Sequence, residues 1–189
     1  MHAGLTAMVP DDADRVRDAG SPEGLVREAL PTLGALDFRL IELLFFAYRE
    51  FTSDADEILE RYGFGRAHHR ILHFVNRDPG MTVADLLDLL RITKQSLSRV
   101  LRQLVEADLV RQEPGEADRR QRCLFPTETG RALTLELSRA QVRRIDAAMA
   151  GTRPEERAAI SQFLMAMGTD REATRAWFAK KGITKDPAP

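Results

Sequence analysis

The apolar residues in the stretch 36–61 recur at the three- and four-residue spacing of a helix, and Gly63 stands where a C-cap glycine is expected. Further apolar side chains lie outside that stripe, namely Phe38, Ile41, Phe45 and Tyr48. A helix that is apolar on nearly every face has to be covered on more than one side. We therefore expect a second copy of the chain to cover it. A position at the centre of the chain's own core is the alternative.

The rest of the pattern predicts five more helices and one β-hairpin. Thr82 with Asp85, and Thr152 with Glu155, have the spacing of capping boxes at two helix starts. Short strand-like runs at 109–113 and 121–125 flank a loop that begins with Pro114 and Gly115. The helices are expected at 66–76, 82–90, 93–107, 127–150 and from 152 towards Trp177.

Two short capped helices joined by a brief turn at Arg91 and Ile92, followed by a hairpin, describe a winged helix-turn-helix. The predicted fold class is therefore mainly α with a small β-hairpin wing, a winged helix-turn-helix domain plus a helical dimerisation region. We expect a flexible N-terminal arm at 1–31, the dimerisation region at 32–63 and 152–181, and the DNA-binding region with its linking helix at 64–151.

The second helix of this motif has two distinct sides. Its apolar residues fall together and are expected to face the core, namely Leu97, Val100, Leu101, Leu104 and Val105. Gln95, Arg99 and Arg102 point the opposite way, flanked by Ser96 and Ser98. Amide, hydroxyl and cationic groups of this kind read base edges and bind phosphates in a major groove.

Charge is unevenly distributed along the chain. All 189 residues together have a net charge of -1, which argues against a protein that coats any polyanion. Between Arg91 and Arg122, however, eight basic and five acidic side chains leave a net charge of +3. Cations confined to one region release counterions only there, as site-directed DNA binding requires.

The hairpin loop carries Asp118, Arg119 and Arg120. An arginine at a hairpin tip fits a narrow minor groove, where the potential is most negative. Asp118 would repel phosphate, so we expect its carboxylate to hold an arginine fork in place. Taken singly, the helix face and the loop are equally compatible with an ordinary solvated surface. Their order along the chain is what favours DNA binding.

The sequence resembles the MarR family of bacterial regulators over about residues 36–167. The stretches that carry the resemblance are 82–87, 93–101, 109–111, 118–120 and 127–130. The most specific part is Asp-x-Arg at 118–120 followed by Thr-x-x-Gly at 127–130. The resemblance implies a triangular, mostly helical homodimer that binds a pseudo-palindromic operator, with Arg120 at the minor groove and Asp118 bracing it.

The resemblance also implies that a small ligand between the dimerisation and DNA-binding lobes changes the spacing of the two recognition helices. Two positions depart from the family pattern. Arg91 stands in the turn where glycine is frequent, and we expect it to add a phosphate contact or to alter the turn. Pro126 stands where leucine usually precedes the threonine, a change tolerated at a strand end.

These observations predict a homodimeric, sequence-specific DNA-binding transcription regulator, a ligand-responsive repressor without enzymatic activity. A winged-helix module that binds protein through the same surface is the alternative. The expected DNA-binding residues are Thr82, Arg91, Thr93, Lys94, Gln95, Ser96, Ser98, Arg99, Arg102, Asp118, Arg119 and Arg120. The expected dimerisation residues are Leu36, Leu40, Phe45, Ile160, Phe163 and Leu164.

Other chemistry receives less support from the residues. The lone Cys123 excludes a disulfide framework and indicates a reducing cytoplasm, although Arg122 beside it leaves redox sensing open. His69 and His73 share a helical stripe near Asp54, Asp56 and Glu57, so a metal sensor stays an alternative. We expect no cofactor, because the chain has no glycine-rich phosphate loop, and no membrane span, because no apolar run approaches about 18 residues.

Overall fold

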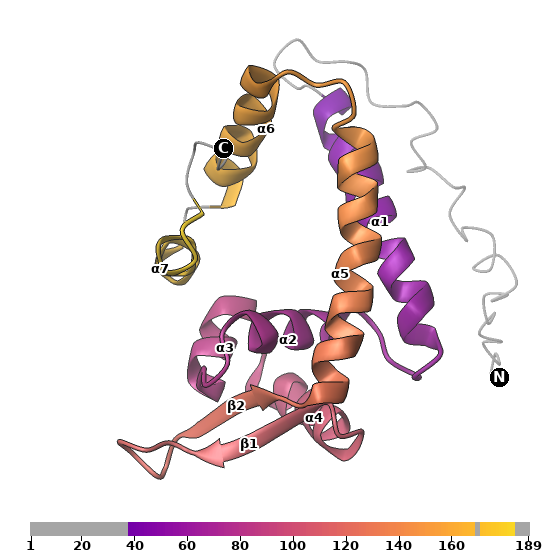
Figure 1. Cartoon of the computed structure of the whole chain (residues 1–189). Coiled ribbons are helices and arrows are strands. Elements are labelled where there is room, and N and C mark those ends of the chain that lie inside the picture. Colours follow the sequence, from indigo (N-terminus) through magenta and orange to yellow (C-terminus); the bar gives the residue numbers. More distant parts are fainter. Residues whose placement is uncertain (1–37, 169–170, 184–189) are drawn as a thin grey trace, which may run out of the picture. The chain divides into compact units, whose positions relative to one another are not determined.

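The computed structural model describes residues 38–168 and 171–183, and Figure 1 shows their arrangement. Seven helices and one hairpin follow each other in this part of the chain: α1 (Phe38–Glu60), α2 (Arg66–Arg77), α3 (Val83–Leu90), α4 (Lys94–Glu106), β1 (Val110–Pro114), β2 (Arg122–Pro126), α5 (Glu128–Ala148), α6 (Pro154–Gly168) and α7 (Glu172–Lys180). The predicted fold class, mainly α with a small β-hairpin, is confirmed. The expected arm at 1–31 and Leu36 lie outside the described residues.

Threonine caps explain where three of these helices begin. The hydroxyl oxygens of Thr82, Thr93 and Thr127 each accept a hydrogen bond from the backbone N–H three residues on, at 3.1, 3.2 and 2.9 Å. The Thr82 backbone N–H donates to the Asp85 carboxylate at 3.0 Å, which completes the expected capping box. Each cap satisfies a helix N–H that has no partner within the helix.

Two expectations for the C-terminal third are wrong. Thr152 and Glu155 do not form a capping box; Thr152 donates to the Met149 carbonyl at 2.7 Å, and the Glu156 carboxylate accepts from the Arg153 N–H at 2.9 Å instead. The last helix also does not continue to Trp177. It ends at Gly168, and α7 is a separate helix that begins after Arg171. Glycine has a low helix propensity, in agreement with the end of α6 at Gly168.

The core lies where α2, α3, α4 and the hairpin meet. Leucines from four elements are completely buried there, namely Leu72, Leu86, Leu97, Leu104 and Leu124. β1 pairs with β2 in antiparallel register from Val110 opposite Pro126 to Pro114 opposite Arg122. The segment before α3 adds to the same sheet, because the Leu124 N–H donates to the Met81 carbonyl at 2.9 Å. The hairpin is therefore attached to the segment before α3 through β2, and it contacts α4 through β1.

One residue expected in this core lies outside it. Val105 is 39% exposed, whereas the other four apolar residues of the inner α4 face are buried. It follows the fully buried Leu104 by one position, which turns its side chain about 100° around the helix, to the edge of the apolar side. Helical spacing alone places Val105 on the apolar side and does not show where that side stops being covered.

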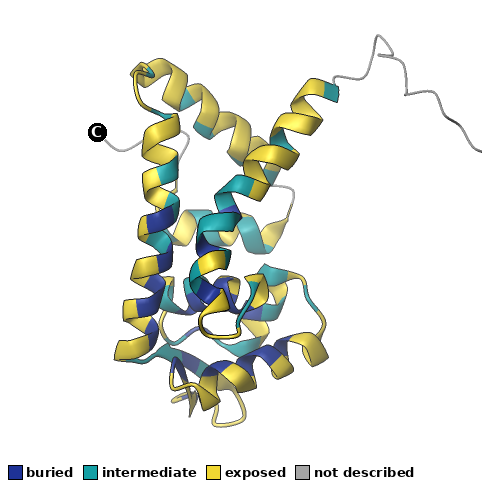
Figure 2. Ribbon diagram, turned by 90° about the vertical axis from the view of Figure 1, so that its right-hand side faces the viewer, coloured by how far each residue is buried: buried dark blue, intermediate teal, exposed yellow. Residues whose placement is uncertain are grey.

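Large apolar side chains are exposed on two helices. On α1 and α6 these are Leu40, Ile41, Leu43, Phe45, Phe46, Tyr48, Ile160, Phe163, Leu164 and Met167. The buried residues of α1 all lie in its C-terminal part, at Thr52, Ala55 and Leu59, and α6 has none. Figure 2 shows both stretches largely in the colour of exposed residues. No helix in the described part of the chain combines the length and the apolar character needed to cross a bilayer.

Candidate nucleic-acid interface

Helix α4 presents polar and cationic groups on the side that does not face the core. Leu97, Val100 and Leu101 turn inward, while the opposite side is exposed and carries Lys94, Gln95, Ser96, Ser98, Arg99 and Arg102. The side chains of Lys94, Arg99 and Arg102 form no hydrogen bond or ion pair with any other residue of the described part. They are free to meet an anionic partner without breaking an internal contact. The predicted face of this helix is thus exposed as expected.

The hydroxyls of Thr82, Thr93 and Ser96 are engaged in helix capping. Thr93 accepts from the Ser96 N–H and donates its hydroxyl hydrogen to the Ser96 hydroxyl at 2.9 Å. These residues lie at the starts of α3 and α4, where backbone N–H groups and the positive end of the helix dipole attract phosphate. These hydrogen bonds fix the two helix starts, and a direct hydroxyl contact with DNA would compete with them.

A hydrogen bond from α4 to α2 holds the recognition helix in place. The His68 Nε2 and the Gln103 Oε1 lie 3.0 Å apart, and His68 Nδ1 accepts from the Gly65 N–H at 3.1 Å. His68 is therefore a buried, hydrogen-bonded imidazole, as its position among apolar residues indicates. Gln103 was not among the residues predicted from the sequence, because no spacing rule pairs its polar side chain with His68, 35 positions earlier.

The wing loop is closed by its own backbone. The Asp118 carboxylate accepts from the Arg120 backbone N–H at 2.9 Å, and the Gly115 N–H donates to the Gln121 carbonyl at 3.0 Å. The expectation that Asp118 holds an arginine fork is wrong in this structure, because its bond goes to the main chain of Arg120. An aspartate two residues before an amide forms such a turn locally, at a lower entropic cost than fixing a long guanidinium. Arg119 and Arg120 are exposed.

Arg91 adopts a left-handed backbone conformation in the turn between α3 and α4, with φ of 54°. Such a conformation is uncommon for a residue with a Cβ and favours glycine. Its side chain is exposed. The turn therefore keeps the shape that a glycine would give it, and it carries a cation in addition.

A cavity of about 270 Å³ lies behind this surface, between α1, α2 and α5. Its lining residues are Tyr48, Phe51, Thr52, Arg66, His69, Arg70, His73, Phe74 and Gln141. Burial lowers the pKa of both His69 and His73, so the neutral imidazoles are favoured there. From the sequence only the two histidines could be associated with each other, because Tyr48 and Phe51 come from α1 and Gln141 from α5, far from α2 along the chain.

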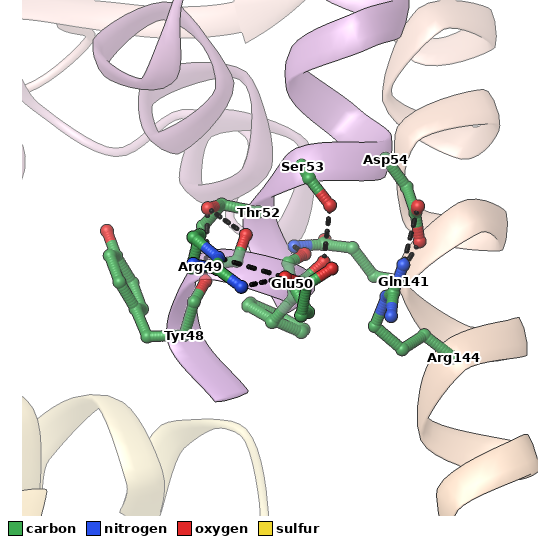
Figure 3. Close-up of polar contacts among 9 residues, drawn as sticks. Tyr48, Arg49, Glu50, Thr52, Ser53, Asp54, Gln141 and Arg144 are labelled. Atoms are coloured by element: carbon green, nitrogen blue, oxygen red, sulfur yellow. Dashed lines mark hydrogen bonds and ion pairs between the residues drawn. The ribbon is translucent and has the colours of Figure 1, made fainter. Parts of the chain in front are cut away.

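Two of the three carboxylates considered as partners for these histidines, Asp54 and Asp56, are bound to arginines. Asp54 accepts two hydrogen bonds from Arg144 of α5, at 2.9 and 2.8 Å, and Gln141 donates to the Phe51 carbonyl at 3.4 Å (Figure 3). Asp56 accepts from Arg66 at 2.7 Å. In the described ranges, three or more His, Cys, Asp or Glu side chains nowhere converge as they would around a metal ion.

Known proteins are similar to this chain in sequence and in fold. A model of the MarR family matches residues 62–121, which span the helix-turn-helix and most of the wing loop. The HTH-type transcriptional regulator PetP of Rhodobacter capsulatus is 48% identical over 151 residues, which cover 79% of this chain and 89% of the relative. An uncharacterised HTH-type transcriptional regulator of Bacillus subtilis, YybA, is 22% identical over 86% of this chain and 94% of its own length.

Solved structures have the same architecture at lower identity. A MarR protein from Peptoclostridium difficile superposes with a TM-score of 0.64 at 19% identity, covering 82% of this chain and all of its own. FabT of Streptococcus pneumoniae, solved in complex with DNA, superposes with a TM-score of 0.61 at 19% identity over 69% of this chain and 94% of its own. The family-model match and the 48% identity to PetP over 79% of this chain, together with the helix-turn-helix and the hairpin, show that the chain belongs to the MarR family of transcriptional regulators.

Proposed function

We propose that the chain is a homodimeric, sequence-specific DNA-binding regulator that inserts α4 into a major groove and Arg120 of the wing into the flanking minor groove. One observation carries the proposal: the exposed face of α4 offers Gln95, Ser98 and Arg99 together, with the cations unpaired in the described part of the chain. An amide and a guanidinium are the groups that form bidentate contacts with adenine and guanine. The net charge of +3 between Arg91 and Arg122 supplies the phosphate attraction.

Roles follow for the remaining predicted residues. Lys94, Arg102, Arg119 and Arg91 are proposed to bind phosphate, since each is an exposed cation on α4, in the wing loop or in the turn. Thr82, Thr93, Ser96 and Asp118 are proposed to hold the elements that make these contacts.

The dimer is proposed from the exposed apolar helices. Leu40 and Phe45 on α1, and Ile160, Phe163 and Leu164 on α6, are all more than a third exposed, and Phe45 reaches 70%. Apolar side chains gathered at helical spacing in this way mark a surface for association. A two-fold interface uses the same patch on both copies and sets two α4 helices about one turn of DNA, roughly 34 Å, apart.

Ligand-responsive repression is proposed from the cavity between α1, α2 and α5. Three aromatic rings, Tyr48, Phe51 and Phe74, line it together with polar side chains, and such a mixture suits a small molecule that carries both apolar and polar groups. A molecule that binds one arrangement of these helices better than another would shift the spacing of the recognition helices. Such a shift releases DNA when the favoured arrangement does not fit the operator.

The experiment begins by selecting bound fragments from the source genome and then compares Gln95→Ala with the wild type on the selected operator and on random DNA. We expect operator affinity to fall about ten-fold, roughly 1.4 kcal/mol, with little change on random DNA. Gln162→Ala, an exposed glutamine on α6, is the matched control. Equal losses on both DNAs would contradict base reading by Gln95. Affinity that does not weaken as salt rises would favour a protein-binding module over DNA binding.

A further inference from the structure

Helix α7 is docked on the helix-turn-helix. The ring of Trp177 packs edge-on against Phe74 of α2, with centroids 4.9 Å apart and planes at 81°. α7 also contacts α3, and the two helices line one groove with Asp78, Met81 and Arg91 between them. A T-shaped aromatic pair of this kind contributes beyond its buried area. The contact therefore fixes a specific orientation of α7.

Two lysines at the end of α7 bind the Asp78 carboxylate. Lys180 and Lys181 both donate to Asp78, Lys181 at 3.0 Å, and Lys181 donates to the Arg77 carbonyl at 2.6 Å as well. The side chains of Lys181 and Asp78 are only 14% and 16% exposed. Lys181 also lies 4.9 Å over the Trp177 ring. A partly buried pair with additional hydrogen bonds has a defined geometry, unlike a solvated surface ion pair.

Asp78 belongs to the turn that organises the DNA-binding motif. It follows α2 as the C-cap residue, and its carbonyl accepts from the Met81 N–H at 3.1 Å. Gly80 and Met81 then pair with Leu124 of β2, at 2.7 and 2.9 Å, and Thr82 caps α3. A residue that anchors this turn therefore helps to fix the positions of both strand β2 and the start of α3.

α7 also connects this turn to α6. The two helices are separated by three residues, 169–171, and Gly168 at the end of α6 lies close to the Phe178 ring. α6 has no buried residue, so it is not held in the core of its own chain. α7 therefore lies between the end of α6 and this turn.

We propose that Asp78, Lys181 and Trp177 are positioning residues for DNA binding, which dock α7 as a strut between α6 and the turn that anchors the wing. The proposal rests on the proposed DNA-binding function. No residue of the strut has to touch DNA. Releasing α7 leaves the contact groups of α4 in place but loosens the wing and the start of α3 relative to them.

The test uses Trp177, the only tryptophan of the chain, as a fluorescence probe in the full-length protein. Asp78→Asn and Lys181→Gln are each expected to shift its emission to the red, to raise iodide quenching at least two-fold and to weaken operator binding about five-fold. Asp146→Asn is the matched control, because it makes the same charge change at an exposed site on α5. Added positive charge alone strengthens DNA binding, so weakening by Asp78→Asn separates positioning from charge.

The outcomes are distinguishable. Trp177 that stays shielded in both variants would overturn the docking contact, and Trp177 that becomes exposed at unchanged operator affinity would overturn the positioning role. Should Asp78→Asn fail to fold, Lys181→Gln decides the matter by comparison with Arg139→Gln, which removes the same charge at an exposed site on α5. If the wild type binds no operator, the proposed function fails first, and the fluorescence of the variants still shows whether α7 is docked.

Discussion

At the scale of single residues, Thr127 and Gly130 show why the motif after the wing has its spacing. Thr127 donates its hydroxyl hydrogen to the Asp108 carbonyl at 2.6 Å and accepts from the Gly130 N–H, so it ties α5 to the end of α4. A Cβ on Gly130 would lie 1.9 Å from the Leu109 carbonyl oxygen. Only glycine permits this approach of the α5 backbone to the start of β1. The Thr-x-x-Gly pattern thus allows the start of α5 to pack closely against the backbone at Asp108 and Leu109.

Replacing Gly130 by alanine is therefore expected to destabilise the fold. The added methyl group meets backbone, which cannot move aside as a flexible side chain can, and we expect a loss of about 3 kcal/mol. Urea denaturation followed by circular dichroism measures the change. Gly168→Ala is the control, because there the nearest atom is an aromatic carbon at 3.8 Å. Equal stability of the two variants would contradict the close approach at Gly130.

At the scale of elements, α4 and the wing were predictable because their signals are local. Thr82 and Thr93 are N-cap residues that indicate where α3 and α4 begin. The spacing of the apolar residues Leu97, Val100 and Leu101 indicates which side of α4 is buried. The exposed cations follow from that side by geometry alone. The same reasoning gave the hairpin, since two short runs flank a loop with proline and glycine.

Features that depend on distant segments were not predictable in this way. Helical periodicity runs on through Met167, so α7 was expected as a continuation of α6, and its docking depends on Phe74 and Asp78 about a hundred residues earlier. The cavity behind His69 needs Tyr48 and Gln141 beside it, which only the folded chain provides. For Asp118, a local bond to the Arg120 backbone competed with the expected side-chain pair and was formed instead.

The wing makes a prediction of its own. Arg120→Ala is expected to reduce operator affinity about ten-fold, roughly 1.4 kcal/mol, because the minor-groove contact and its counterion release are lost. The unfolding transition is expected to stay unchanged, since the Arg120 side chain is exposed and only its backbone N–H holds the loop. Fluorescence anisotropy with labelled operator measures the affinity. Arg139→Ala, an exposed cation on α5, controls for charge; a similar loss there would remove the specific role of the wing.

At the scale of the whole molecule, the exposed apolar residues of α1 and α6 form the surface through which we propose that two copies associate. In a two-fold interface each residue occurs once in each subunit, so one substitution in the sequence removes two contacts. The same interface determines how far apart the two α4 helices stand. Dimerisation and operator spacing are therefore one property in this proposal.

Phe45→Asp is expected to convert the dimer to monomer at micromolar concentration. It places a carboxylate in the apolar surface twice, at a cost of about 2 kcal/mol or more per copy. Sedimentation velocity measures the result. Val105→Asp introduces the same charge on an exposed valine outside the proposed interface and is expected to leave the dimer intact. A Phe45→Asp protein that remains dimeric would place the interface elsewhere.

The most direct measurement of where the protein meets DNA is cleavage by a tethered iron chelate. With Cys123 replaced by serine, a new cysteine at Ala117 in the wing loop carries the reagent, and a cysteine at Ala159 on α6 serves as control. We predict that the Ala117 probe cuts the operator at two symmetric positions that flank half-sites about 34 Å apart, and that the Ala159 probe cuts neither. Bound protein whose Ala117 probe leaves the operator uncut would contradict the central claim.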